Sequence, residues 1–170
     1  MIEVFAAKKK KKKLMARTKI VADLKDFLKS NNIFKELCDE YEQDVSILDG
    51  IPVVFTSEID VTAKTINAKV FLNTSLVDEK FEIMARYLIH ELAHCFQHME
   101  NEGKKQDKNK KDYLNRPEEL EAFQYQIKFD AKERSGEKAN DYVNDLLSYH
   151  DIPKSKRDIK KRELMNKLDD

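Results

Sequence analysis

Two histidines spaced four residues apart could share a metal ion. They belong to the run His90-Glu91-Leu92-Ala93-His94. On a helix, residues four apart lie about 40° apart around the axis, so both imidazoles point toward one place. Imidazole nitrogens are common zinc ligands, and this spacing is that of a zinc-binding helix in hydrolases. The sequence therefore predicts a helix that carries two zinc ligands, His90 and His94.

Glu91 is the candidate general base. It lies about 100° from His90 around the helix, which is too far for the same kind of ligand but close enough to reach a zinc-bound water. We predict that it accepts a proton from that water during hydrolysis of an amide bond. The alternative is that the three side chains are satisfied polar groups of the core, but their burial without a metal would be costly.

A catalytic zinc ion usually has three protein ligands and one open position. The long pattern His-Glu-x-x-His-x-x-Gly-x-x-His fails, because Gln97 stands at the glycine position and Glu100 at the last histidine. His98 follows His94 at the same spacing of four residues. Side chains from three successive turns of one straight helix cannot all reach one ion, so we expect His98 at the surface or at the rim of the site. His150 has no ligand-like context. The third ligand is therefore expected elsewhere, among Glu118, Glu119 and Glu121.

The run Glu119-Leu120-Glu121-Ala122 begins 25 residues after His94. It resembles the Glu-x-Glu-Ala element of the ImmA/IrrE-like metallopeptidases, and similar elements occur in small phage-encoded zincins. The resemblance covers about residues 81–129. It implies a gluzincin site with a Zn2+ cofactor, a protein or peptide as substrate, and Glu121 as the third metal ligand. Glu118, three residues earlier on the same helical face, is the reserve choice.

A peptidase also needs a hydrogen-bond donor for the oxyanion that forms on the substrate carbonyl. Two tyrosines are candidates for this catalytic role. Tyr113 precedes the helix that carries the glutamates, and Tyr125 lies one turn beyond Glu121.

Two other functions remain open. The chain could be a phage-associated structural or interaction protein whose zinc site is catalytically silent, although a structural site has no need of a base such as Glu91. It could also bind nucleic acid through the six lysines of Lys8–Lys13. The chain as a whole is not basic, because its 32 basic residues balance 32 acidic ones. Its net charge therefore does not attract nucleic acid or membrane.

Periodicity predicts the elements that position these residues. Helices are expected from Thr18, over 33–41, from Asp78 to Phe96, from Pro117 to Arg134 and over 138–149. Short β-branched runs predict strands over 51–55 and 65–72, and residues 101–112 predict an exposed loop.

The expected fold is an α+β, zincin-like domain, in which a small β-sheet packs on the metal-bearing helix and the C-terminal half is rich in helix. We expect a disordered basic leader (1–17), the metallopeptidase domain (18–152), and a charged C-terminal tail or helix (153–170). The strand over 65–72 could border the site and pair with an extended peptide, by analogy with zincins.

Composition indicates the compartment. No run approaches the ~20 apolar residues that cross a bilayer, and no secretory signal is visible. Cys38 and Cys95 therefore predict reduced core thiols in a cytoplasmic protein.

Overall fold

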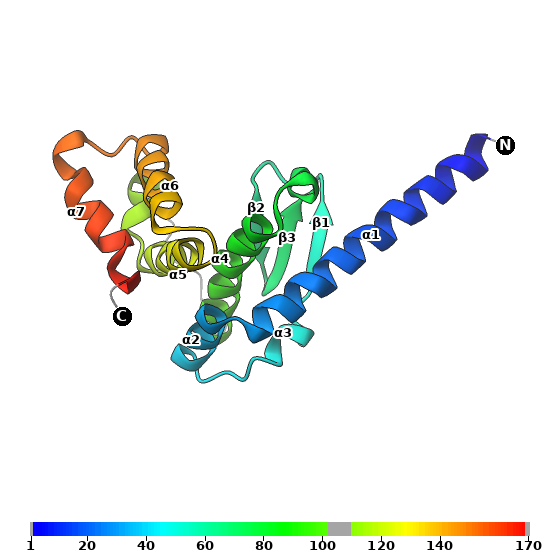
Figure 1. Cartoon of the computed structure of the whole chain (residues 1–170), viewed down its shortest axis with the longest axis horizontal. Coiled ribbons are helices and arrows are strands. Elements are labelled where there is room, and N and C mark those ends of the chain that lie inside the picture. The colour runs from blue at the N-terminus through cyan, green and yellow to red at the C-terminus, as the bar shows by residue number, and fades with distance from the viewer. Residues whose placement is uncertain (1, 102–109, 169–170) are drawn as a thin grey trace.

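The computed structural model describes residues 2–101 and 110–168 as an α+β fold (Figure 1). Three strands form one sheet, and α-helices make up most of the described chain. The elements are α1 (Ile2–Ser30), α2 (Asn32–Glu40), α3 (Ile47–Gly50), β1 (Val53–Thr56), β2 (Ala63–Ile66), β3 (Lys69–Asn73), α4 (Phe81–Glu100), α5 (Pro117–Glu133), α6 (Gly136–Tyr149) and α7 (Lys154–Leu164). Short 3-10 helices follow β3, precede α5 and follow α7. The predicted loop over 101–112 falls largely outside the described residues.

The sheet has the strand order β1-β3-β2, with β1 parallel and β2 antiparallel to the central β3. The prediction of one strand over 65–72 is wrong, because a two-residue turn divides it into β2 and β3. Asn67 and Ala68 form this turn with φ values of 50° and 57°. Two consecutive residues of positive φ match the right-handed twist of a hairpin. The alternation of side chains continues on both sides of the turn, which is why periodicity alone missed it.

Helix α1 begins at Ile2 and so includes the residues predicted as a disordered leader. Thr18, where the helix was expected to start, lies inside it, and its hydroxyl donates to the carbonyl of Leu14 at 3.0 Å. Lysine has a good helix propensity, which is compatible with a helix through the lysine run. The N-terminal half of α1 extends away from the rest of the molecule (Figure 1).

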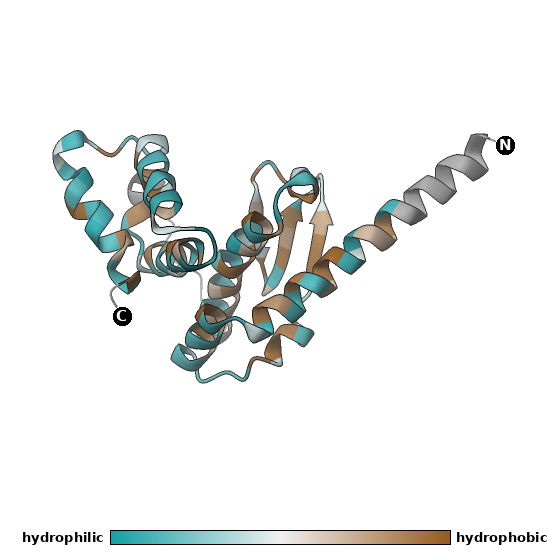
Figure 2. Cartoon of the chain, in the orientation of Figure 1, coloured by the Kyte–Doolittle hydropathy of each residue, from teal (hydrophilic) through white to brown (hydrophobic). Residues whose placement is uncertain are grey.

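Two apolar clusters lie on either side of α5. The larger joins the C-terminal half of α1, α2, the sheet and α4 to one face of α5, and both Cys38 and Cys95 are buried in it as free thiols. The smaller joins the other face of α5 to α6 and α7, where Leu164 is fully buried. Figure 2 shows the matching pattern, with hydrophobic residues on the inner sides of the helices and hydrophilic ones outside.

Helices α4 and α5 pack against each other in opposite directions along a polar seam. Near the start of α4, the Arg86 guanidinium lies 3.4 Å from the carboxylate of Asp130, near the end of α5. Arg134 donates to the same fully buried carboxylate at 2.9 Å. Near the end of α4, Gln97 donates to the backbone carbonyl of Glu118 at 3.0 Å. These contacts fix the relative positions of the two helices at both ends of the seam.

No helix in the described part of the chain is both long and apolar enough to span a membrane.

The hairpin turn makes a prediction about stability. Ala68 adopts a left-handed conformation that glycine adopts without steric cost. Ala68→Gly should therefore raise the free energy of unfolding by about 0.5–1 kcal/mol, measured by urea denaturation. Asn67→Ala should lower it, because asparagine tolerates this conformation better than alanine does. A destabilised Ala68→Gly variant would contradict the turn geometry.

Candidate metal centre

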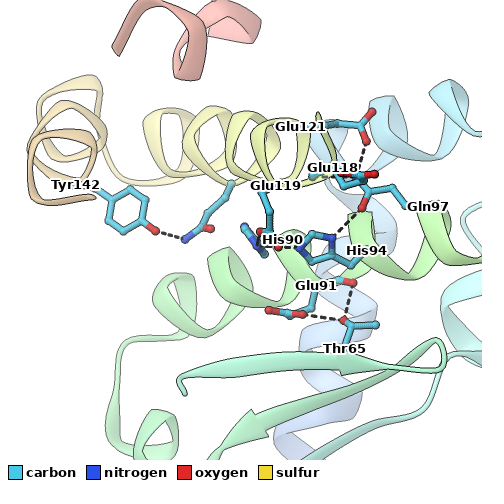
Figure 3. A network of polar contacts seen from close by, with 10 residues as sticks. Thr65, His90, Glu91, His94, Gln97, Glu118, Glu119, Glu121 and Tyr142 are labelled. Atoms are coloured by element: carbon cyan, nitrogen blue, oxygen red, sulfur yellow. Dashed lines mark hydrogen bonds and ion pairs between the residues drawn. The ribbon is translucent and has the colours of Figure 1, made fainter. Parts of the chain in front are cut away.

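Three side chains from the α4–α5 seam bring their ligand atoms together (Figure 3). The Nε2 atoms of His90 and His94 are 3.2 Å apart. Glu119 Oε2 lies 3.6 Å from the first and 3.3 Å from the second. The histidines lie one turn apart on α4, and Glu119 reaches them from the first turn of α5. Together they form a triangle of two nitrogens and one carboxylate oxygen.

The size of this triangle fits a zinc ion. Zinc bonds to nitrogen and oxygen of about 2.0–2.1 Å in tetrahedral geometry place ligand atoms about 3.3–3.4 Å apart. In addition, Glu119 Oε2 is buried and has no hydrogen-bond partner in the described part of the chain. A buried carboxylate oxygen without a hydrogen bond is costly unless a cation is near it. The donor set and its spacing therefore suit a small divalent cation that accepts imidazole and carboxylate.

The charges of the cluster reinforce one another. Burial alone would lower the pKa of His94, but the nearby carboxylates of Glu119 and Glu91 raise it to about 9. Burial alone would raise the pKa of Glu119, but the two histidines that face its carboxylate hold this pKa well below its usual range. The site thus attracts positive charge, and a proton on His94 competes with a metal for it.

Glu91 points from α4 toward the sheet rather than toward α5 (Figure 3). The hydroxyl of Thr65, on β2, lies 2.7 Å from its carboxylate and 3.0 Å from its backbone carbonyl. Glu91 is 7% exposed and follows a ligand directly in sequence. Thr65 therefore holds the carboxylate in one orientation beside the histidine pair, and sequence reasoning did not identify this partner.

Tyr113 lies beside the cluster, as expected for a candidate donor. It belongs to the 3-10 helix η2 (Lys110–Asn115) that precedes α5. Burial raises its pKa, and so do the charge of Glu119, a hydrogen bond to that carboxylate and the charge of Glu91. The phenol is therefore protonated at neutral pH and can donate a hydrogen bond near both carboxylates.

The structure does not bring Glu121 or Tyr125 to the histidines. Glu121 lies two residues after Glu119, about 200° around the helix, and so faces away from the triangle. Its carboxylate accepts hydrogen bonds from Tyr41 at 2.6 Å and from Gln97 at 2.7 Å. Tyr125 donates its hydroxyl to Glu40 on α2 instead. Glu119, rather than Glu121, therefore completes the group that could hold a metal ion.

Glu118, the reserve choice, also lies outside the triangle. It contacts Gln97 through its backbone carbonyl, which accepts a hydrogen bond from the Gln97 amide. His98 is half-buried one turn beyond His94 and is not in the group of converging ligand atoms found among the described residues. His150 lies closer to the site than its sequence context indicated. Its ring stacks on Tyr113, with 5.1 Å between centroids and 13° between planes.

Sequence reasoning chose Glu121 over Glu119 because several glutamates stand together at the start of α5. In the structure, Phe123, four residues after Glu119 on the same face, contacts His90 edge-on with ring centroids 4.5 Å apart. An aromatic residue also follows Glu121 by four positions, at Tyr125, so this spacing alone does not show which glutamate faces the histidines.

The chain matches no protein-family model, no curated protein and no solved structure at a significant level. Its function must therefore be inferred from the residues of the site.

The geometry predicts which glutamate holds a metal. Glu119→Ala should weaken zinc binding by more than about 100-fold, beyond the usual effect of losing a residue that only supports a ligand. Competition with a chromophoric chelator measures this. Glu118→Ala, one residue away on the same helix, is the matched control and should bind zinc as the wild type does. Loss of zinc binding in Glu121→Ala but not in Glu119→Ala would reverse the assignment.

Proposed function

We propose that the chain is a zinc-dependent metallopeptidase that hydrolyses peptide bonds. The observation that carries this proposal is the convergence of His90, His94 and Glu119 next to an oriented carboxylate, Glu91. A purely structural zinc site is closed by four protein ligands, whereas three ligands leave one position for a substrate or water. A structural zinc site does not need an adjacent carboxylate, whereas hydrolysis needs a base.

The chemistry follows from the positions of these groups. Zinc held by the three ligands would polarise a substrate carbonyl and make water more acidic. Glu91, fixed by Thr65, accepts a proton from the water that attacks the carbonyl carbon. Glu91 then gives this proton to the amide nitrogen as the carbon–nitrogen bond breaks. The products are a carboxylic acid and an amine.

Tyr113 is our candidate for the hydrogen-bond donor in the same reaction. Its protonated phenol lies beside Glu119. A hydrogen bond from this phenol to that oxygen stabilises the transition state more than the ground state. We assign Tyr113, rather than Tyr125, as the donor.

The sheet favours an extended peptide as substrate. Strand β2 is an edge strand, paired only with β3 among the described residues. Its Thr65 contacts Glu91, so this strand lies next to the reacting groups. An extended chain added to an edge strand forms backbone hydrogen bonds that hold a peptide bond in register. The side chains of His94 and Glu119 remain 17% and 15% exposed, which leaves that face of the cluster open to solvent.

Replacement of the base tests the mechanism. Glu91→Gln should retain zinc but lower kcat for peptide hydrolysis by about 10²–10⁴-fold, because the amide cannot accept the proton of water. Activity can be followed with a fluorogenic peptide library, and metal content by elemental analysis. Glu100→Gln, an exposed change on the same helix, should leave both unchanged.

Two outcomes would reject the peptidase proposal. In one, Glu91→Gln keeps full activity. In the other, the wild type binds zinc but hydrolyses no peptide of the library, which would support a catalytically silent zinc site instead.

The role of Tyr113 can be tested separately. Tyr113→Phe keeps the ring that stacks on His150 but removes the hydroxyl, so kcat measured at saturating zinc should fall by about 10²-fold. Tyr125→Phe should leave kcat near the wild-type value, because that hydroxyl is directed to α2. Equal losses in the two variants would contradict the assignment.

A further inference from the structure

We propose that Gln97 and Glu121 are positioning residues that hold His94 with its proton on Nδ1, so that Nε2 is free to bind the metal. The proposal rests on the metal site proposed above and extends it to the hydrogen bonds behind one ligand. Neither residue touches a ligand position of the metal. Both act through His94.

The first step concerns the orientation of the Gln97 amide. Its nitrogen lies 3.0 Å from the backbone carbonyl of Glu118 and 2.7 Å from the carboxylate of Glu121 (Figure 3). A backbone carbonyl can only accept a hydrogen bond, so the atom that faces it must be the NH2 group. The amide oxygen therefore faces the other way, toward His94.

The second step concerns the proton on His94. Its Nδ1 lies 2.7 Å from the amide oxygen of Gln97. This oxygen can only accept, so Nδ1 must carry the proton of the hydrogen bond. In the neutral imidazole, the lone pair then lies on Nε2, which is the atom 3.3 Å from Glu119 and 3.2 Å from His90. The tautomer that binds metal is thus selected by a glutamine three residues away.

The third step concerns what holds Gln97. Its side chain is buried, with only 3% of the residue exposed, so water does not replace its partners. Glu121 accepts from Tyr41 as well as from Gln97, and this ties the amide to α2 as well as α5. By contrast, Nδ1 of His90 is buried and has no hydrogen-bond partner among the described residues. Within this part of the chain, the two histidines are therefore held differently, and a side-chain hydrogen bond supports Nδ1 of His94 alone.

The same contacts explain the Glu-x-Glu pair at the start of α5. Glu119 faces the histidine pair, and Glu121 on the opposite side supports the amide behind one of those histidines. One short segment of α5 thus supplies a ligand and part of the support for another ligand. In this arrangement, Glu121 contributes to metal binding without contacting the metal.

The test compares Gln97→Leu with a matched control, Gln126→Leu. Gln126 is a similarly buried amide on α5 that donates to Tyr142 and has no hydrogen bond to a histidine among the described residues. Gln97→Leu should weaken zinc affinity by about 10–100-fold, the usual effect of losing an outer-shell partner, while Gln126→Leu should not.

The second readout is the proton itself. Long-range ¹H–¹⁵N spectra of full-length protein at alkaline pH, with zinc and without it, should show a slowly exchanging proton on Nδ1 of His94. Gln97→Leu should make this proton exchange rapidly. The proposal is overturned if Gln97→Leu keeps both the affinity and the slow exchange, or if Gln126→Leu loses as much affinity. Failure of the wild type to bind zinc would reject the proposed function, whereas the metal-free spectrum would still decide the tautomer.

Discussion

The packing of α4 against α5 is the constraint on which the other features depend. It buries two imidazoles and a carboxylate in one place, which would be costly if their ligand atoms had no partner. The helices are aligned at one end by the buried Asp130 and at the other by the hydrogen bond from Gln97 to the carbonyl of Glu118. Between these ends, the alignment leaves the distances of 3.2–3.6 Å that suit a metal. The contacts that hold the helix pair together therefore also determine the geometry of the site.

Helix α4 serves two neighbours at once because consecutive residues lie about 100° apart around its axis. His90 faces α5, and Glu91 faces the sheet, where Thr65 orients its carboxylate. The two histidines and Glu119 are therefore positioned by helix packing, and the Glu91 carboxylate by β2. Because the supports are separate, the Glu91 carboxylate is oriented toward the sheet and not toward Glu119. One edge strand of the small sheet is enough to give this orientation.

The sequence predicted the parts of the molecule that depend on local pattern. The histidine spacing, the buried helix around it and the free buried cysteines belong to this group, and so does the α+β class with a small sheet. The hairpin at Asn67 and Ala68 was not predictable from alternation, because a two-residue turn hardly interrupts it. Which glutamate converges with the two histidines depends on which face of α5 packs against α4. That helix is apolar on two faces, since it packs between two clusters, so its periodicity does not identify the face.

A helix rotation of about 200° separates the roles of Glu119 and Glu121. Once α5 turns Glu119 toward the histidines, Glu121 must lie on the far side, where Tyr41 and Gln97 satisfy it. A short motif such as Glu-x-Glu-Ala therefore does not determine which of its two carboxylates faces the histidines. The deciding quantity is the rotation of the helix against its partner, and Phe123 and Asp130 set that rotation through their contacts with His90 and Arg86. Because these contacts lie along one face of α5 with Glu119, a change that rotated this helix would move Glu119 away from the histidines. It would also break the contacts of Gln97 with Glu118 and Glu121.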